Sequence, residues 1–327
     1  MRLGSCLALL LVLLVAAVLP VWPVYAAGMD SGDLAEPGTL WIFSTVMGFL
    51  MPVGVMLVFW GGSGWDQMPG MASAGMQGLF LAMVGYFATG FGLQYGGIGW
   101  GHDLPGLEGL AAPFVSTNQV TAGFFGTRGF FLLGEAAGPG PLFLFLSHLP
   151  WVMTAVLLPT MGLQRHAPGW VRAIAGLLIG GLVYPLVANW AWAGGPAVIT
   201  AQAGGWLGNL GFNAGLGHGF VDFGEASIMH LTGGSFVLIG LLLLGKRTPK
   251  ADPDIVPAMP PIQLPMLAVL GMLLWGLGWL ANLLSHPLWV GAAIPWATVM
   301  LGMLAGMLAG ASLSQVYAWF TRARRMP

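Results

Sequence analysis

Three ionisable side chains stand close together in an otherwise apolar part of the chain, in the segment DFGEASIMHLTGG from Asp222 to Gly234. Two of them are the carboxylates Asp222 and Glu225, and the third is the imidazole of His230. Carboxylates at the mouth of a membrane path favour cations over anions. A buried neutral imidazole donates from one nitrogen and accepts at the other, so it can relay a proton or hand on a polar molecule. Ionisable groups inside a membrane are costly, and this segment therefore indicates a path for something polar.

Each of these side chains also has a structural interpretation. Asp222 directly precedes the apolar segment and can cap the first turn of a helix, and this role is compatible with attracting a cation. Glu225 has the spacing of a capping box, in which its carboxylate reaches back to the amide of Asp222, and we favour that role over a pore carboxylate. His230 can simply hydrogen-bond neighbouring helices, and its spacing alone does not separate this role from lining a pore.

Other candidate side chains lie near the ends of apolar segments. Trp192 precedes a glycine-rich segment, where its ring can hold a small cation. Asn282 and Ser285 form a polar patch in LANLLSHP, which can equally be interfacial. His148 is a second histidine within an apolar segment, and Pro150 beside it leaves a backbone carbonyl in need of another partner.

The composition excludes several classes of function. With 57% hydrophobic and only 6% charged residues among 327, the chain is an integral membrane protein in contact with the lipid bilayer. A net charge of −1 argues against a nucleic-acid partner, and the single cysteine, Cys6, leaves no disulfide or thiolate site. We find no hydrolase triad, nucleotide-binding loop or metal-ligand spacing, and we predict no catalytic residue, no metal, no cofactor and no enzyme activity.

Residues 1–27 are predicted to be a signal peptide. They contain one positive charge at Arg2 and an apolar run from Leu7 to Leu19. An uncleaved first membrane helix is the alternative, and we favour the leader because Pro20 and Pro23 stand where the apolar run ends. Residues 28–327 are then one transmembrane domain.

Seven apolar stretches after the leader are long enough to span a membrane. They cover approximately residues 39–60, 72–97, 138–163, 169–191, 223–245, 262–284 and 291–320. Glycines inside them, among them Gly180, Gly181, Gly271, Gly276 and Gly278, predict close packing of helix backbones.

The Lys and Arg residues between these spans are distributed unevenly. Eight of the nine that follow the leader come after the third, fifth and seventh spans, and only Arg128 falls on the other side. Because positive charge is retained in the cytoplasm, we predict a mature N-terminus outside and a C-terminus inside, in the plasma (inner) membrane.

The stretch from Tyr184 to Arg247 resembles the ammonium transporter and Rhesus-glycoprotein family. YPLVANWAWAGG followed by GFVDFGEASIMHLTGGSFVLIGLLLLGKR is similar to the family's fourth and fifth helices. LPMLAVLGMLLWGLGWLANLLS, which ends at Ser285, is similar to its sixth helix, and FWGG, GFGLQYGG and GLQR carry weaker similarity. We therefore predict an all-α membrane protein with about seven transmembrane helices after a cleavable leader. The resemblance implies that these helices correspond to the first repeat of the transporter fold plus two helices.

The resemblance also implies roles for individual residues. Trp192 matches the tryptophan of the family's outer ammonium site, Ser285 the serine that contributes to it, and Asp222 its supporting acid. His230 matches the first of two pore histidines, and we assign Asn282 to the same path. The family recruits ammonium, removes its proton and passes neutral ammonia, and it assembles as a trimer.

The sequence also departs from the family pattern. The chain stops after what resembles the seventh helix, the second pore histidine has no counterpart by position, and the two gate phenylalanines fall on Pro150 and Ala281. We therefore expect ammonium or ammonia transport by a partly retained, channel-like domain. We further expect it to work as a homo-oligomer or with a second polypeptide that supplies the missing helices. A non-conducting ammonium-binding sensor or partner subunit is the alternative, and a truncated or frameshifted gene product is the third.

Overall fold

Helices dominate the described part of the protein. The computed structural model describes residues 38–63, 67–98, 106–110, 125–192, 205, 207, 210, 215, 220, 222, 224–245, 263–284 and 296–323. Within them, seven helical segments are long and apolar enough to cross a membrane. The predicted all-α fold with about seven spans is therefore confirmed. The predicted leader, residues 1–27, lies outside the described residues.

The helix bounds follow the apolar stretches of the sequence closely. The spans are α3 (Thr39–Gly48) with α4 (Leu50–Gly61), α5 (Met68–Gly85) with α6 (Phe91–Tyr95), α8 (Pro139–Gly162), α9 (Gly169–Leu178) with α10 (Tyr184–Trp192), α12 (Ala226–Leu244), α13 (Gln263–Leu284) and α14 (Trp296–Ala323). Short 3₁₀ turns cover Glu108–Leu110, Phe130–Leu132 and Gly134–Ala137. The fifth span starts three residues later than predicted, because Gly224 and Glu225 are not helical and α12 begins at Ala226.

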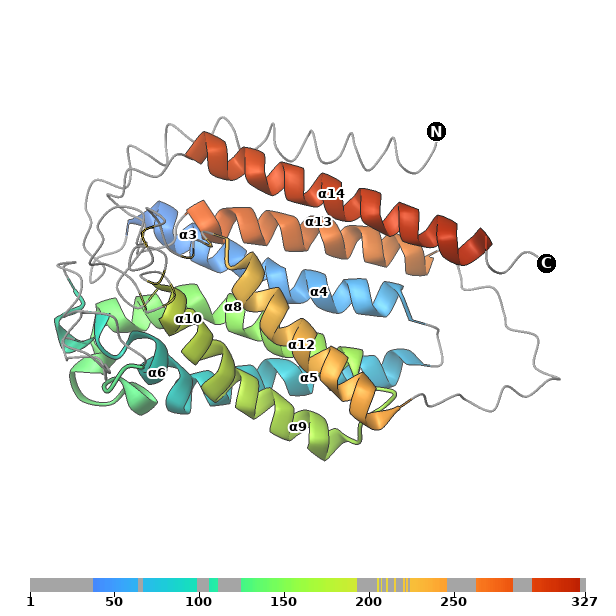
Figure 1. Cartoon of the computed structure of the whole chain (residues 1–327). Coiled ribbons are helices and arrows are strands. Elements are labelled where there is room, and N and C mark those ends of the chain that lie inside the picture. Colours follow the sequence, from blue (N-terminus) through green and yellow to red (C-terminus); the bar gives the residue numbers. More distant parts are fainter. Residues whose placement is uncertain are drawn as a thin grey trace. The chain divides into compact units, whose positions relative to one another are not determined.

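The chain divides into two compact units, residues 1–291 and 292–327. The second unit contributes α14, a continuous apolar helix. The first unit contains the other six spans, whose helices are labelled in Figure 1, and the candidate site residues.

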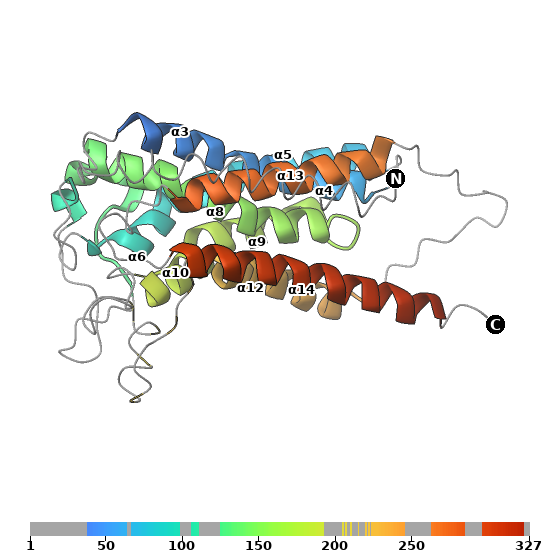
Figure 2. The same cartoon turned by 90° about the horizontal axis from the view of Figure 1, so that it is seen from above.

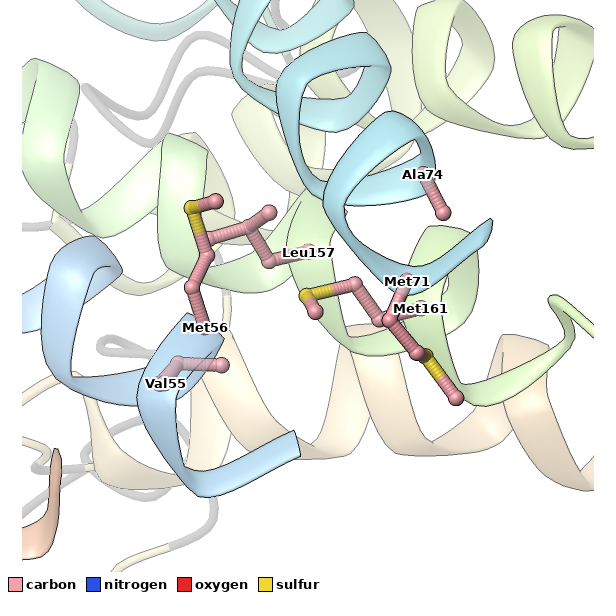
Figure 3. Packing of buried hydrophobic residues seen from close by; sticks show 6 residues of the cluster. All are labelled: Val55, Met56, Met71, Ala74, Leu157 and Met161. Atoms are coloured by element: carbon pink, nitrogen blue, oxygen red, sulfur yellow. The ribbon is translucent and has the colours of Figure 1, made fainter. Parts of the chain in front are cut away.

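Helix α8 forms the core of the first unit. Of its span, 83% is buried, and no other span exceeds 44%. It packs against α4, α5, α9 and α12, and one cluster of side chains from three helices fills the space beside it (Figure 3). The cluster consists of Val55 and Met56 from α4, Met71 and Ala74 from α5, and Leu157 and Met161 from α8. Because α8 is enclosed on most sides, a polar side chain on it must find its partners within the protein.

Glycines allow the backbones of neighbouring helices to approach closely, as predicted. Helix α13 packs along α3 and α4 in both views (Figure 1 and Figure 2). A Cβ atom on Gly271 of α13 would lie 2.5 Å from the carbonyl oxygen of Gly54. A Cβ atom on Gly276 would meet no atom within 4 Å, so this glycine does not mediate a described contact.

Two spans contain a single π-helical turn where they pass each other. Residues Tyr86–Gly90 form one between α5 and α6, and Ile179–Val183 form the other between α9 and α10. The hydroxyl of Thr89 donates to the carbonyl of Gly181 at 2.7 Å and joins the two turns. Tyr86 opens the first turn and Tyr184 directly follows the second, so both tyrosines sit where the helical register changes. Such turns occur frequently at functional sites.

Candidate functional site

Asp222 caps the N-terminus of α12, as predicted. Its Oδ2 atom accepts hydrogen bonds from the backbone amides of Ser227 at 2.7 Å and Ile228 at 3.1 Å. Both amides belong to the first turn, whose N–H groups have no partner within the helix. The side chain is partly exposed, so its charge also acts on the surroundings of the helix end.

The capping-box role predicted for Glu225 is wrong. The residue adopts a left-handed backbone conformation with φ of 49°, and its side chain makes no capping bond. The carboxyl group is instead fully buried, and Oε2 accepts a hydrogen bond from the hydroxyl of Tyr184. Asp222 has already taken two amides of the first turn, while the interior offers Glu225 a hydroxyl and an imidazole.

That imidazole belongs to His148 in the centre of α8. Its Nε2 atom lies 3.2 Å from Oε1 of Glu225, 2.9 Å from the Tyr184 hydroxyl and 2.8 Å from Nε2 of Gln94. On the other side of the ring, Nδ1 lies 2.9 Å from the hydroxyl of Tyr95. His148 has no exposed surface, so these contacts replace water around the ring.

Aromatic rings enclose the His148 side chain. The ring of Tyr86 stacks against it at 6.0 Å, and Tyr95 meets it edge-on at 5.3 Å. The hydroxyl of Tyr86 donates to Oε1 of Gln94 at 3.0 Å, and the Asn189 amide donates to the backbone carbonyl of Gln94 at 2.7 Å. We call His148, Glu225, Tyr184, Tyr95 and Gln94 the buried polar cluster.

The surroundings favour the neutral form of the Glu225 carboxyl group. Burial raises its pKa well above the ordinary value of a glutamate, the hydrogen bond from Tyr184 opposes this, and the charge of Asp222 adds to it. A carboxyl group in this setting retains its proton to a higher pH than one in water.

His230 lies on α12 and faces α13. Its ring meets that of Trp275 edge-on at 5.6 Å, and Trp275 stacks on Trp279 at 5.5 Å. The indole N–H of Trp279 donates to the carbonyl of Gly224 at 2.7 Å, which fixes the turn before α12 against α13. The two tryptophans therefore connect His230 with the turn that contains Glu225.

Asn282 connects α13 to α8. Its Oδ1 atom accepts from the indole N–H of Trp151 at 2.6 Å, and its Nδ2 atom donates to the carbonyl of Ser147 at 2.9 Å. Only 1% of Asn282 is exposed. These bonds give the residue a structural role, and its assignment to a pore remains a prediction.

Trp192 and Ser285 are the two remaining predicted site residues. Trp192 ends α10, and its side chain is outside the described part of the structure. Ser285 directly follows α13 and also lies outside the described residues. Among the described residues, no group of three or more His, Cys, Asp and Glu side chains could hold a metal ion.

Comparisons with known proteins agree with the resemblance seen in the sequence. The profile of the Ammonium Transporter Family matches residues 39–321. Ammonium transporter Amt2 of Archaeoglobus fulgidus is 26% identical over 282 residues, which cover 84% of this chain and 52% of that protein. Ammonium transporter Amt1 of Methanocaldococcus jannaschii is 30% identical over 163 residues, or 49% of this chain and 37% of that protein.

A solved structure described as a Sensor Amt Protein has a similar fold. It matches with a TM-score of 0.54 and 22% identity, over 74% of this chain and 52% of that one. The chain thus spans about half the length of the relatives that match most of it.

Proposed function

The chain belongs to the ammonium transporter family, and from that premise we propose that it conducts ammonium or ammonia along a path that starts beside Asp222 and passes His230. The observation that carries this proposal is the start of α12. Asp222 caps its first turn with a partly exposed carboxylate. His230 lies four residues after Ala226, the first residue of α12, or about 6 Å along the helix axis. A carboxylate at the mouth attracts a cation, and an imidazole deeper in can hand on the neutral molecule.

Trp192 and Ser285 complete the proposed outer site. Trp192 ends α10 and Ser285 directly follows α13. In the predicted topology both helices run from inside to outside, so these two residues belong to the outer face, as does Asp222. An indole ring and a hydroxyl oxygen there would bind a small cation by its charge and by a hydrogen bond. Asn282 would line the path near its outer end.

Part of the path would come from outside this chain. An inverted-repeat pore lies between two repeats, and this chain spans about half of its matched relatives. We propose that second copies of the chain, as in a trimer, or another polypeptide supply the remaining wall within the bilayer. Transport would follow the gradient and would involve no enzymatic step.

A non-conducting sensor or partner subunit that binds ammonium is the second candidate. It is favoured by Pro150 and Ala281, which stand where the resemblance places the family's gate phenylalanines. Pro150 lies buried within α8 and has no aromatic ring, so this position cannot supply a gate of the family's kind.

Flux of methylammonium into proteoliposomes tests the proposal. The purified chain is expected to conduct above empty vesicles, and His230→Ala is expected to reduce the flux at least tenfold. The matched control is His166→Ala, which changes a histidine in the turn between α8 and α9 and should leave the flux unchanged. Folded protein that conducts no better than empty vesicles would reject transport by this chain alone and favour the sensor or partner role.

A further inference from the structure

We propose that Glu225, Tyr184 and His148 form a buried site that binds one exchangeable proton. Tyr184 links the other two side chains, because its hydroxyl donates to Oε2 of Glu225 and lies 2.9 Å from Nε2 of His148. The ligand is a proton, so the inference goes beyond the proposed function and does not require that ammonium passes through the chain.

The site is costly for the fold, which indicates a role other than stability. Glu225 is fully buried in a left-handed backbone conformation that residues other than glycine rarely adopt. A conformation of this kind is strained for a residue that carries a side chain, and burial of a carboxyl group adds to that cost. Both costs fall on one residue, and the surrounding contacts hold it in place.

The second oxygen of the Glu225 carboxyl group, Oε1, lies beside the imidazole of His148. Oε1 of Glu225 is buried and receives no donor among the described residues, and its basic neighbour is Nε2 of His148 at 3.2 Å. A proton on either atom can therefore form a direct hydrogen bond between Oε1 and Nε2, in addition to the indirect link through Tyr184.

Charge balance fixes the number of protons at one. The titratable groups described around Glu225 are His148, Asp222, Tyr184, Tyr86 and Tyr95. Among them, only His148 can become positive. A protonated carboxyl beside a neutral imidazole and a carboxylate beside an imidazolium both hold one proton and no net charge. Losing that proton would bury a net negative charge near the carboxylate of Asp222, and gaining a second would bury a net positive charge inside the cluster.

The hydroxyl of Tyr184 gives this proton a route between its two holders. While Glu225 is a carboxylate, Tyr184 donates to it and its oxygen accepts from the Nε2–H of His148. When the proton has moved to Glu225, the carboxyl donates to Tyr184 and Tyr184 donates to the bare Nε2. One proton leaves the imidazole, another reaches the carboxylate, and the hydroxyl reverses its direction.

The rest of the buried polar cluster adapts to either state. Nδ1 of His148 can donate to the Tyr95 hydroxyl in both states. Gln94 presents its Nε2 atom to Nε2 of His148, where it competes with Tyr184 as donor to a bare imidazole nitrogen, and its Oε1 atom accepts from Tyr86. Rotation of the Gln94 amide by half a turn would present oxygen to a protonated Nε2 instead.

Infrared difference spectroscopy of the full-length chain in lipid vesicles tests this site directly, by recording the C=O stretch of protonated carboxyl groups during a pH titration. Replacing the imidazole in His148→Gln leaves Glu225 as the sole holder, and a buried carboxyl band is expected at neutral pH at full intensity. Glu225→Gln in the same background should abolish that band. The matched control, Glu135→Gln, changes an exposed glutamate that pairs with Arg128 and should leave the band unchanged.

Two further variants keep the test decisive. Glu225→Gly removes the carboxyl group while suiting the left-handed backbone, so it should fold and lack the band. Tyr184→Phe removes a hydrogen bond that favours the carboxylate, so the band should persist to higher pH.

The proposal is overturned if no Glu225 band appears in either the wild type or His148→Gln. It is equally overturned if His148→Gln and Tyr184→Phe both leave the band unaltered, or if sodium or ammonium displaces the band at constant pH. None of these outcomes depends on flux, so the site and the transport proposal can fail separately.

Discussion

Asp222 combines two roles in one side chain. A single carboxylate oxygen accepts two amide bonds of α12, and the charge interacts favourably with the positive end of the helix dipole. The same partly exposed charge adds negative potential where the proposed path begins. Capping depends on an oxygen acceptor, whereas cation attraction depends on charge, so substitutions can separate the two roles.

We predict that Asp222→Ala lowers the free energy of unfolding by about 1 kcal/mol, because the amides of Ser227 and Ile228 lose their acceptor. Asp222→Asn should retain most of the stability, since its amide oxygen can still accept, but it should lower the apparent affinity for methylammonium. Thermal melting in detergent and the concentration dependence of flux measure the two effects. Equal melting temperatures for the two variants would contradict the capping role.

The contrast between Asp222 and Glu225 shows what local spacing can reveal. Asp222 was predictable because its partners lie five and six residues ahead. The partners of Glu225 lie much further back in the chain, in α10 and α8, and its left-handed backbone turns the side chain inward. His148 and Glu225 were each noticed in the sequence, but no pattern there indicated that the fold brings them together.

At the scale of helices, the hydrophobic stretches predicted where the spans begin and end, but they did not predict the π-helical turns inside two of them. The bounds agree because a membrane helix needs a nearly continuous apolar run. The π-helical turns Tyr86–Gly90 and Ile179–Val183 were not predicted, since they arise where two backbones pass each other rather than from local composition. Tyr86 begins one of these turns and Tyr184 directly follows the other. The π-helical turns, which the sequence did not predict, therefore help to position both tyrosines around His148.

Glycine packing between α13 and α4 gives a second prediction. A Cβ atom on Gly271 would lie 2.5 Å from the Gly54 carbonyl oxygen and 2.7 Å from the backbone nitrogen of Val58. We therefore expect Gly271→Ala to separate the two helices and to lower the melting temperature by several degrees. The control on the same helix is Gly276→Ala, whose Cβ atom would be unobstructed and whose helix propensity should be slightly better. A melting temperature unchanged in Gly271→Ala would mean that these backbones do not touch.

At the scale of the whole molecule, the position of the polar groups bears on how the chain works. Asp222, Glu225 and His148 all belong to the first unit; the first two directly precede α12, and His148 lies on α8. The proton site is closed within this unit, whereas His230 sits on α12, which is only 22% buried along its span. The proton site should therefore survive in a single copy, and the conducting path should depend on assembly.

The predicted orientation connects these roles to the membrane, and it can be tested by cysteine labelling. With the N-terminus outside, Ser63 in the turn after α4 faces the cytoplasm and Glu135 before α8 faces outward. In a Cys6→Ser background, we expect a membrane-impermeant maleimide to label Glu135→Cys in intact cells and Ser63→Cys only after permeabilisation. The physical reason is that Arg165, Arg172 and the basic residues after α12 and α14 resist transfer across the membrane. Arg128 is the one basic residue on the predicted outer side, and it pairs with Glu135 at 3.8 Å. The reverse labelling pattern would place Asp222 inside and would remove its role in recruiting an external cation.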